Sequence, residues 1–365
     1  MEAGIVGLPF VGKTALFNAL TALNVSGGAG GSAARPNVGV VNVPDPRLGL
    51  IAQFIETKKI VPATLQLVDV AGLVAGASRG EGLGNRFLAH VRGVEALLHV
   101  VRCFDDPNVP HVEGSVDPVR DIEQVETELM LADLDQVEGM TDKAHKQART
   151  GDKEAKRRLE VIEACQAALS EGRPVSSLQD GPMGNPEARN VVKSIALLTA
   201  KPVLYVANVG EQDMQGIGAH AKCVRAYAES RGGAAVAVCA KLEAELVELD
   251  ESERNEMLEG LGLTEPALAV LARAAYGLLG MHSFFTAGPK EIRAWPIPVG
   301  FTAPLAASTI HSDMQRGFIR AEVFSIEDLK EHHSEQALRS AGKLRVEGKN
   351  YVMQDGDVCH FLFNV

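Results

Sequence analysis

The sequence predicts an α/β fold in which a doubly wound, mostly parallel β-sheet carries an inserted helical hairpin and is followed by a small α+β domain. Three observations support this prediction. Short apolar runs of strand length alternate with helical stretches. A charged segment with helical periodicity replaces these runs between Val119 and Val192. From about Leu278 onward, prolines separate short strand-like pieces.

The apolar runs define five expected strands. They have the length and the β-branched content of buried strands, and helical stretches separate them. Because parallel strands need long crossover connections, this alternation favours a parallel sheet that binds ligands at the carboxyl ends of its strands. The expected strands are residues 4–6, 64–69, 96–101, 202–207 and 234–239.

The interrupting segment predicts two antiparallel helices. Thr150 and Gly151 supply the turn between them, and Asp152 is placed to cap the second helix. Basic residues on both sides of the turn predict a positively charged tip: Lys143, Lys146, Arg149, Lys153, Lys156, Arg157 and Arg158. A solvated tip and an RNA-facing tip are equal alternatives.

Length and composition predict the domain organisation. With 365 residues, of which 46% are hydrophobic, the chain can form two or three domains. We expect the sheet domain at 1–124 and 196–277, the helical insertion at 125–195 and the C-terminal domain at 278–365. The formal net charge of -11 argues against binding nucleic acid over the whole surface, so any RNA contact needs a local patch.

The chain is expected to be cytoplasmic and to make no membrane contact. Its start has no basic segment followed by an apolar one, and no apolar run approaches the length that spans a bilayer. The five cysteines are scattered, without the close pairs that bind zinc. We interpret them as reduced core thiols.

A glycine-rich motif carries the strongest chemical signal. The segment Gly7-Leu-Pro-Phe-Val-Gly-Lys-Thr14 fits the pattern G-x-x-x-x-G-K-[ST], and it lies between an expected strand and an expected helix. Its glycines let backbone N–H groups close around a β-phosphate, and Lys13 brings a cation to the β- and γ-phosphates. Thr14 offers its hydroxyl to Mg²⁺. We therefore expect a nucleoside triphosphate and Mg²⁺ at this loop.

A second motif, Asp69-Val-Ala-Gly72, follows another expected strand. Asp69 at the strand end can hold Mg²⁺ through water, and Gly72 can donate its backbone N–H to the γ-phosphate. In many GTPases a glutamine that orients the attacking water comes next, but this chain has Leu73. Because leucine cannot polarise water, another group must do so or turnover will be slow.

The expected base-binding motifs are Asn208-Val-Gly-Glu211 and Cys239-Ala-Lys-Leu-Glu243. In GTPases of this topology the first motif ends in Lys-x-Asp, whose carboxylate accepts hydrogens from guanine N1 and N2. Val209 and Glu211 replace that lysine and aspartate. The residues therefore favour ATP at least as much as GTP, although the longer glutamate leaves GTP open.

Several segments together resemble the YchF or Obg-like ATPase family. They are the run Val68-Asp-Val-Ala-Gly-Leu that continues to Asn85, and residues 100–104, 111–118, 208–211 and 284–291. The similarity runs nearly from end to end. It implies a Ras-like P-loop NTPase domain, a helical coiled-coil insertion and a C-terminal TGS domain, which is a ubiquitin-like β-grasp module ending in residues 348–365.

The resemblance also implies a function. Members prefer ATP, associate with ribosomes and are linked to translation and stress responses, so a slow Mg²⁺-dependent switch is expected. The backbone near Asn208 and Val209 is expected to contact the adenine. For the missing glutamine the family points to His111, whose neutral imidazole could position or activate water. A loop histidine that is hydrogen-bonded to the backbone is the equal alternative.

The expected site combines catalytic, metal-binding and nucleotide-binding residues. Lys13 and His111 are the catalytic candidates, and Thr14 and Asp69 are the metal candidates. The nucleotide-binding candidates are Gly7, Phe10, Val11, Gly12, Lys13, Thr14, Ala15, Gly72, Asn208, Val209, Glu211, Ala240 and Lys241.

Two departures from the family pattern affect this site. Family members carry Asn where this chain has Phe10, so one polar contact to the nucleotide is lost. The first switch region of the family reads Thr-Ile-Asp/Glu-Pro-Asn, whereas this chain has Ala33-Ala-Arg-Pro-Asn37. Because Ala33 cannot coordinate a metal, we expect Mg²⁺ to be held by Thr14, phosphates and waters, with a weakly ordered switch.

Two other functions remain open. The chain could be a nucleotide-gated ribosome or RNA adaptor with little turnover, acting through the hairpin tip and the TGS domain on rRNA or ribosomal protein. It could also be a true GTPase. Phosphate release separates the first from a hydrolase, and competition between ATP and GTP separates the second.

Overall fold

The computed structural model describes residues 2–22, 37–70, 83–178 and 184–364. The chain forms two units. The first unit comprises residues 1–39 and 66–271, and the second comprises 40–65 and 272–365. The expected division had placed 40–65 in the first domain and had separated the helical insertion. The two units do not separate the helical insertion from the sheet domain, so its expected bounds, 125–195, remain a proposal.

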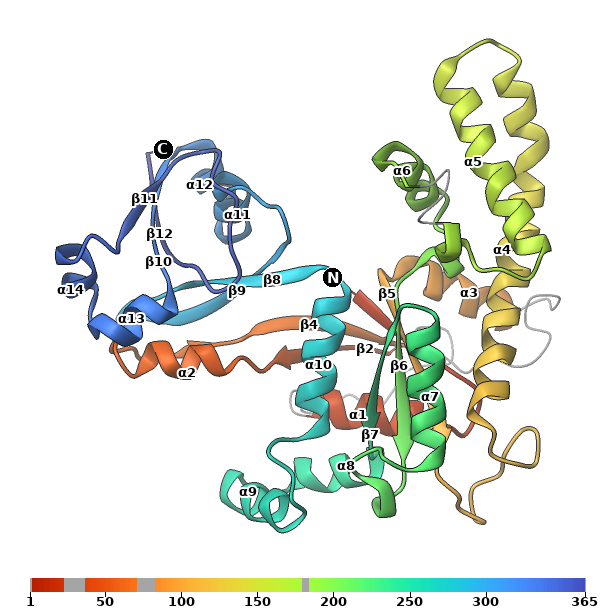
Figure 1. The fold of residues 1–365 in the computed structure, drawn as a ribbon, viewed down its shortest axis with the longest axis horizontal. Coiled ribbons are helices and arrows are strands. Elements are labelled where there is room, and N and C mark those ends of the chain that lie inside the picture. The colour runs from red at the N-terminus through yellow and green to blue at the C-terminus, as the bar shows by residue number, and fades with distance from the viewer. Residues whose placement is uncertain (1, 23–36, 71–82, 179–183, 365) are drawn as a thin grey trace. The chain divides into compact units, whose positions relative to one another are not determined.

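The first unit is built on a mostly parallel sheet with helices (Figure 1). The strand order is β2-β4-β1-β5-β6-β7, and β1 pairs in parallel with β4 and β5, as β6 does with β5 and β7. The strands are β1 (Glu2–Val6), β2 (Asn37–Val43), β4 (Ala63–Asp69), β5 (Ala96–Cys103), β6 (Val203–Val209) and β7 (Ala234–Val238), and the unit boundaries at 39/40 and 65/66 fall within β2 and β4. The five expected strands are confirmed, and β2 is a sixth that the sequence analysis missed.

Helices connect these strands and cover the sheet. All eight residues of β5 are buried, as expected of a central strand with helices on both faces. The helices outside the insertion are α1 (Lys13–Ala22), α3 (Leu83–Gly93), α7 (Ala219–Ser230), α8 (Ala240–Glu248) and α9 (Glu251–Gly260), and α10 (Ala267–Leu278) begins in this unit and ends in the second. The unit therefore has the doubly wound α/β architecture predicted from the sequence.

The insertion is a helical hairpin of α4 (Pro118–Ala148) and α5 (Lys153–Ser170), followed by α6 (Pro186–Ile195). Gly151 turns the chain with φ 87°, and the Asp152 side chain accepts a hydrogen bond from the Glu154 N–H at 3.1 Å. The predicted turn and cap are thus confirmed. At the base, buried Asp133 accepts hydrogen bonds from the backbone N–H groups of Leu198 and Thr199, both at 2.8 Å, which ties α4 to the returning chain.

The second unit contains a six-stranded sheet in the order β11-β10-β12-β8-β9-β3. Strands β8 and β9 form an antiparallel hairpin, and the last strand, β12, lies parallel to β8 and antiparallel to β10. This is the β-grasp arrangement expected of the C-terminal module. Its strands are β8 (Met281–Thr286), β9 (Ile292–Pro298), β10 (Phe318–Phe324), β11 (Arg345–Glu347), β12 (Val358–Phe363) and β3 (Ile60–Val61).

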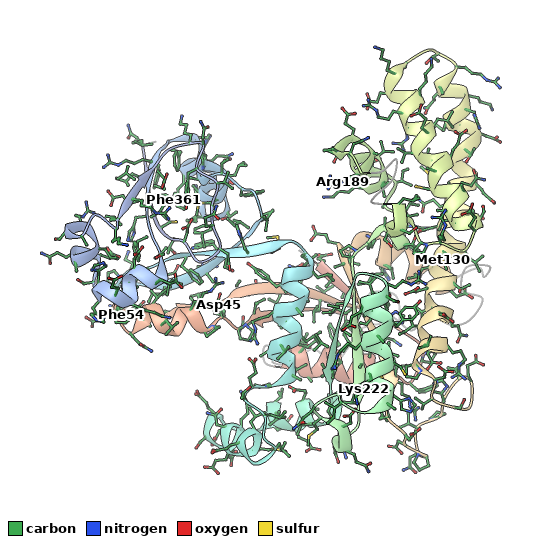
Figure 2. All side chains as sticks on the ribbon, in the orientation of Figure 1. Asp45, Phe54, Met130, Arg189, Lys222 and Phe361 are labelled. Atoms are coloured by element: carbon green, nitrogen blue, oxygen red, sulfur yellow. The ribbon has the colours of Figure 1, made fainter. Side chains whose placement is uncertain are left out.

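Aromatic side chains contribute to the hydrophobic core of this unit. Phe361 (Figure 2) meets Phe284 edge to face, with ring centroids 5.6 Å apart. The helices of the unit are α2 (Pro46–Ala52), α11 (Ala303–Ile310), α12 (Ser312–Arg316), α13 (Ile326–His332) and α14 (Glu335–Ser340).

Residues 40–65 belong to this unit because specific contacts hold them there. Arg47 Nη1 pairs with Asp355 Oδ2 at 2.8 Å, and its guanidinium lies 5.1 Å from the centre of the Phe285 ring. Strand β3 extends the sheet by pairing Ile60 with Ile292. No sequence signal had marked this segment as part of the C-terminal module.

Candidate nucleotide-binding site

The glycine-rich loop lies between the end of β1 and the start of α1, as the motif requires. Two of its glycines have positive φ angles, 147° at Gly7 and 96° at Gly12. A Cβ atom on Gly7 would lie 2.4 Å from the Val100 oxygen, and one on Gly12 would lie 2.2 Å from Asn208 Nδ2. Both positions therefore require glycine, for conformation and for space.

Lys13 closes this loop on itself. Its ammonium donates hydrogen bonds to the backbone oxygens of Gly7 at 2.9 Å and Leu8 at 2.5 Å, and the residue is only 8% exposed. Burial lowers the pKa of Lys13 to about 8, although the nearby Asp69 carboxylate opposes this shift. A phosphate that took the place of the two carbonyl oxygens would restore a full counter-charge to the ammonium.

The first turn of α1 is open to an anion. Thr14 and Ala15 are exposed, Val11 is buried, and the turn carries no acidic side chain. The partial positive charge of a helix start and its free N–H groups favour a phosphate at this place. Phe10 is 57% exposed and adopts φ 65°, a conformation that costs a non-glycine residue energy.

Asp69 lies at the end of β4, directly beside Ile5 of β1. Its carboxylate accepts a hydrogen bond from Asn37 and is close enough to Lys13 for attraction, but burial is the larger effect and raises the pKa of Asp69. Gly72, Leu73 and Ala33 lie outside the described residues. Their expected roles remain predictions.

The donors present fit Mg²⁺. Thr14 and Asp69 offer hydroxyl and carboxylate oxygens, which are the hard ligands that Mg²⁺ prefers. Within the described ranges, no group of three or more His, Cys, Asp or Glu side chains could hold a metal ion. A cation at this loop would therefore depend on phosphate and water oxygens as well, as is usual for Mg²⁺ bound with a nucleotide.

The end of β6 contacts the phosphate loop through Asn208. Its Nδ2 donates to the Val11 oxygen at 2.8 Å, and its Oδ1 accepts from the Ala240 N–H at 3.1 Å. Asn208 is 5% exposed and Val209 is 2% exposed. The amide side chain thus joins the phosphate loop to the start of α8, a bracing role that the sequence analysis did not assign to it.

The other two base-site candidates pair with each other. Lys241 Nζ lies 2.6 Å from Glu211 Oε1, and both side chains are more than half exposed. The carboxylate that would face a guanine is therefore engaged by a cation. Sequence spacing had placed both residues near the base but had not predicted the ion pair.

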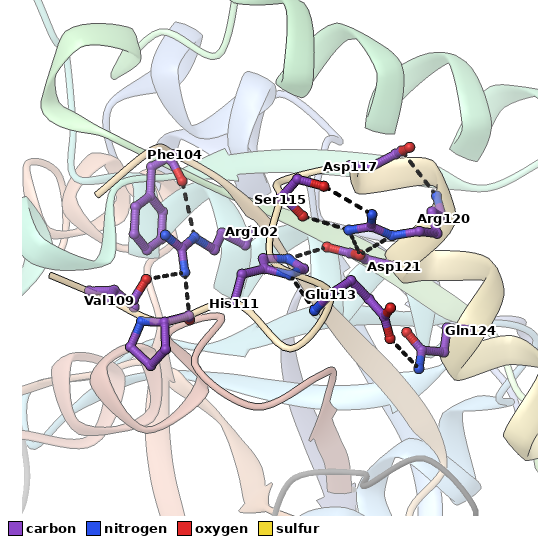
Figure 3. Close-up of polar contacts among 11 residues, drawn as sticks. Arg102, Phe104, Val109, His111, Glu113, Ser115, Asp117, Arg120, Asp121 and Gln124 are labelled. Atoms are coloured by element: carbon purple, nitrogen blue, oxygen red, sulfur yellow. Dashed lines mark hydrogen bonds and ion pairs between the residues drawn. The ribbon is translucent and has the colours of Figure 1, made fainter. Parts of the chain in front are cut away.

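His111 is buried against the first turn of α4 (Figure 3). Its Nε2 lies 2.9 Å from Asp121 Oδ2, and its Nδ1 accepts a hydrogen bond from the Glu113 N–H at 3.0 Å. The His111 side chain is 7% exposed. Among the described residues, no hydrogen bond or ion pair joins it to Lys13 or Thr14. The structure therefore matches the bonded-loop alternative more closely than the water-positioning one, which remains a proposal.

Arg102 organises the segment that leads to His111. It is 3% exposed, and its guanidinium donates to the backbone oxygens of Phe104, Asp106, Val109 and Pro110 at 2.9 to 3.2 Å. Arg102 is not among the site residues predicted from the sequence. A charged residue directly after an apolar expected strand, at 96–101, was the signal that could have revealed it.

The cysteine interpretation needs one correction. All five thiols are free, and Cys103, Cys165, Cys239 and Cys359 are buried as expected. Cys223 is exposed on α7, so it is not a core thiol.

No helix among the described parts of the chain combines the length and apolar character needed to cross a membrane.

A glycine-bounded loop with a buried lysine, at the carboxyl end of a parallel sheet, defines a P-loop NTPase. A family model described as a 50S ribosome-binding GTPase matches residues 2–135. A second model, for the YchF GTPase C-terminal region and described as a protein of unknown function, matches residues 281–364. The first match covers the sheet domain as far as β5 and the start of the helical insertion, and the second covers the strands of the β-grasp module from β8 to β12.

Full-length relatives give the family. Proteins named "Ribosome-binding ATPase YchF" are 47% identical in Escherichia coli O157:H7, over 100% of this chain and 99% of the relative, and 45% identical in Bacillus subtilis, over 100% of both. The solved structure of the Schizosaccharomyces pombe YchF GTPase is 34% identical, with a TM-score of 0.86 over 99% of this chain and 97% of that one. The chain belongs to the YchF family.

Proposed function

We propose that this protein is a Mg²⁺-dependent nucleotide hydrolase that prefers ATP to GTP, binds ribosomes and acts as a slow cytoplasmic switch in translation or the stress response. The observation that carries the proposal is Lys13, a buried ammonium enclosed by its own phosphate loop. The names of the full-length relatives agree with it, because they describe ribosome-binding ATPases.

Binding of the triphosphate would exchange one set of contacts for another. Lys13 would release the Gly7 and Leu8 oxygens and contact the β- and γ-phosphates, while backbone N–H groups of residues 10–15 would donate to phosphate oxygens. Thr14 and Asp69 would hold Mg²⁺, the latter through water. When bound, Mg²⁺ neutralises charge that develops on the phosphates.

The preference for ATP would come from the end of β6. The Asn208 side chain is used within the protein, so the backbone near Asn208 and Val209 is left to contact the adenine. Guanine recognition would need a free carboxylate, whereas that of Glu211 faces Lys241. Adenine lacks the donor pair of guanine N1 and N2, so ATP could bind without breaking the ion pair between Glu211 and Lys241.

Slow turnover would follow because, among the described residues, no free side chain is in place to orient the attacking water. Leu73 cannot orient water. His111, the other candidate, has both ring nitrogens bonded to the protein. Hydrolysis would wait for His111 to be released, and this suits a switch better than a metabolic enzyme.

Contact with rRNA would come from the hairpin tip and the β-grasp module. Several basic side chains at the tip are exposed: Lys143, Lys146, Arg149, Lys153 and Lys156. Arg157 pairs with Glu187, and Arg158 donates to Ser194 Oγ at 3.1 Å, so these two are partly engaged. A local cluster of free cations is what an acidic protein needs to approach RNA.

Two measurements on the purified full chain test the proposal. In the first, ATP and GTP compete for a bound fluorescent nucleotide analogue in the presence of Mg²⁺, and ATP is expected to displace it at the lower concentration. The reverse order would make the protein a GTPase. In the second, phosphate release is followed with saturating ATP. Tight binding without release above background would reduce the protein to a nucleotide-gated adaptor.

A further inference from the structure

The contact between His111 and Asp121 joins the candidate water-positioning residue to the base of the helical hairpin. Both side chains are buried, 7% exposed for His111 and 3% for Asp121. Asp121 lies in the first turn of α4, four residues after the helix-capping Asp117. The histidine is therefore held by a helix that continues to the basic tip.

The hydrogen bonds determine where the proton of His111 lies. Nδ1 accepts from the Glu113 N–H, so it carries no proton in the neutral ring. The ring proton is then on Nε2, which donates to Asp121 Oδ2 at 2.9 Å. With both nitrogens occupied, His111 can neither accept a proton from water nor donate a hydrogen bond to it.

Arg120 supports the carboxylate that holds the ring. Its guanidinium donates to Asp121 Oδ1, at 2.9 Å from Nη2 and 3.2 Å from Nε, and to the Ser115 backbone oxygen at 2.6 Å. The charge of Asp121 is thus compensated, and the loop after His111 is fixed to the same turn. Figure 3 shows the imidazole and the guanidinium on different oxygens of one carboxylate.

We propose that Asp121 is a positioning residue that retains His111 in an unreactive arrangement, so that hydrolysis requires the Asp121–His111 hydrogen bond to break. The inference rests on the proposed function of His111. An ionised acceptor makes this bond stronger than a neutral one would. Weakening the acceptor shifts the equilibrium toward a released histidine.

The activity test uses Asp121→Asn, which keeps the shape and removes the charge. The released state should become more populated, so kcat for ATP should rise about ten-fold while KM stays within two-fold, because only the population of His111 changes. Arg120→Met should act in the same direction with a smaller effect. Asp121→Glu, which keeps a carboxylate, should stay near the wild-type rate. Glu123→Gln, an exposed charge on the same helix, is the matched control.

A second readout reports on the ring directly. Diethyl pyrocarbonate acylates an imidazole nitrogen only when its lone pair is accessible, and peptide mass spectrometry assigns the modified histidine. Without nucleotide, His111 should react about ten-fold faster in Asp121→Asn than in the wild type or Glu123→Gln, in proportion to its release. This readout does not depend on catalysis, so it remains informative if turnover is very slow.

The outcomes separate the two claims. If His111→Ala loses activity and Asp121→Asn gains it, both stand, and the double variant should be as inactive as His111→Ala. If His111→Ala loses activity and Asp121→Asn loses it too or is unchanged, the retaining role of Asp121 is overturned and the proposed function survives. If His111→Ala is fully active, His111 leaves the proposed function and the inference fails with it.

Discussion

Asn208 Nδ2 donates a hydrogen bond to the backbone oxygen of Val11 at 2.8 Å, and this contact joins the base-binding strand to the phosphate loop. The same side chain accepts from the Ala240 N–H at 3.1 Å. One buried amide therefore satisfies backbone groups from two segments that are far apart in the sequence. The conformation of the phosphate loop depends on a residue almost two hundred positions away.

Asn208→Ala should destabilise the protein by about 1 to 3 kcal/mol, because it leaves two buried backbone groups without partners. Urea unfolding of the free protein measures this change. Asn208→Asp is the informative companion variant, since its carboxylate still accepts from Ala240 but cannot donate to Val11. An Asn208→Ala variant as stable as the wild type would show that the brace contributes nothing.

The positive φ angle of Phe10 predicts that glycine is more stable than alanine at this position. Its φ of 65° disfavours any residue with a Cβ, and its ring is exposed, so little packing is lost on truncation. Phe10→Gly should therefore be more stable than Phe10→Ala by about 1 kcal/mol. Thermal unfolding of the two variants in parallel decides this. Equal stability would mean that the free loop does not hold the left-handed conformation.

The lowered pKa of Lys13 predicts that nucleotide affinity depends on pH. Below about pH 8 the ammonium of the free site is already charged, so binding needs no proton. Above that pH the free lysine is neutral while phosphate still requires the cation, so binding takes up a proton. Affinity for Mg·ATP should then fall, by about ten-fold per pH unit at the limit.

Calorimetric titrations between pH 7 and 10 would measure this slope. Lys13→Arg is the matched control, since its guanidinium stays charged throughout and should remove the slope even if it binds more weakly. A slope shared by both proteins would assign the titration to another group.

The ion pair between Glu211 and Lys241 predicts a change in base preference. Lys241→Ala frees the carboxylate, so affinity for GTP should improve relative to ATP, by roughly two-fold or more, a modest effect because the pair is exposed. Competition against a fluorescent nucleotide gives the ratio directly. Adding Glu211→Gln to this variant should return the ratio toward the original. A ratio unaffected by Lys241→Ala would remove the pair from base selection.

Charge reversal at the hairpin tip tests the ribosome contact. Lys146→Glu and Lys153→Glu change exposed residues for which no ion pair is seen among the described residues. Each should weaken cosedimentation with ribosomes at low salt, and the difference from the wild type should shrink as salt rises, because salt screens the contact that the variant has lost. Lys222→Glu on α7 (Figure 2) is the control with the same charge change elsewhere. Equal loss in all three variants would indicate a general charge effect.

Local sequence signals predicted what local interactions determine. The phosphate loop, five parallel strands, the hairpin turn at Gly151 and the cap at Asp152 all follow from patterns within a few residues. The β-grasp module required the family resemblance, because short strands separated by prolines do not specify a strand order.

The long-range contacts of the site could not be predicted from the sequence. The brace from Asn208, the pair of Glu211 with Lys241 and the burial of His111 against Asp121 join residues whose proximity only the folded chain creates. The same reason explains the missed position of residues 40–65, which contact the C-terminal module through Arg47. Motif spacing identified the candidate residues of the site, but it did not show which of their side chains are already engaged in contacts within the protein.

The central claim is that the loop closed by Lys13 binds a triphosphate. Isothermal titration calorimetry of the full chain with Mg·ATP and with Mg·GTP tests it most directly, alongside Lys13→Ala. We expect saturable binding of ATP, weaker binding of GTP, and a loss of at least about ten-fold in ATP affinity in the variant, because a charge-assisted contact disappears. Absence of binding heat for both nucleotides, or equal affinity in wild type and variant, would contradict the claim.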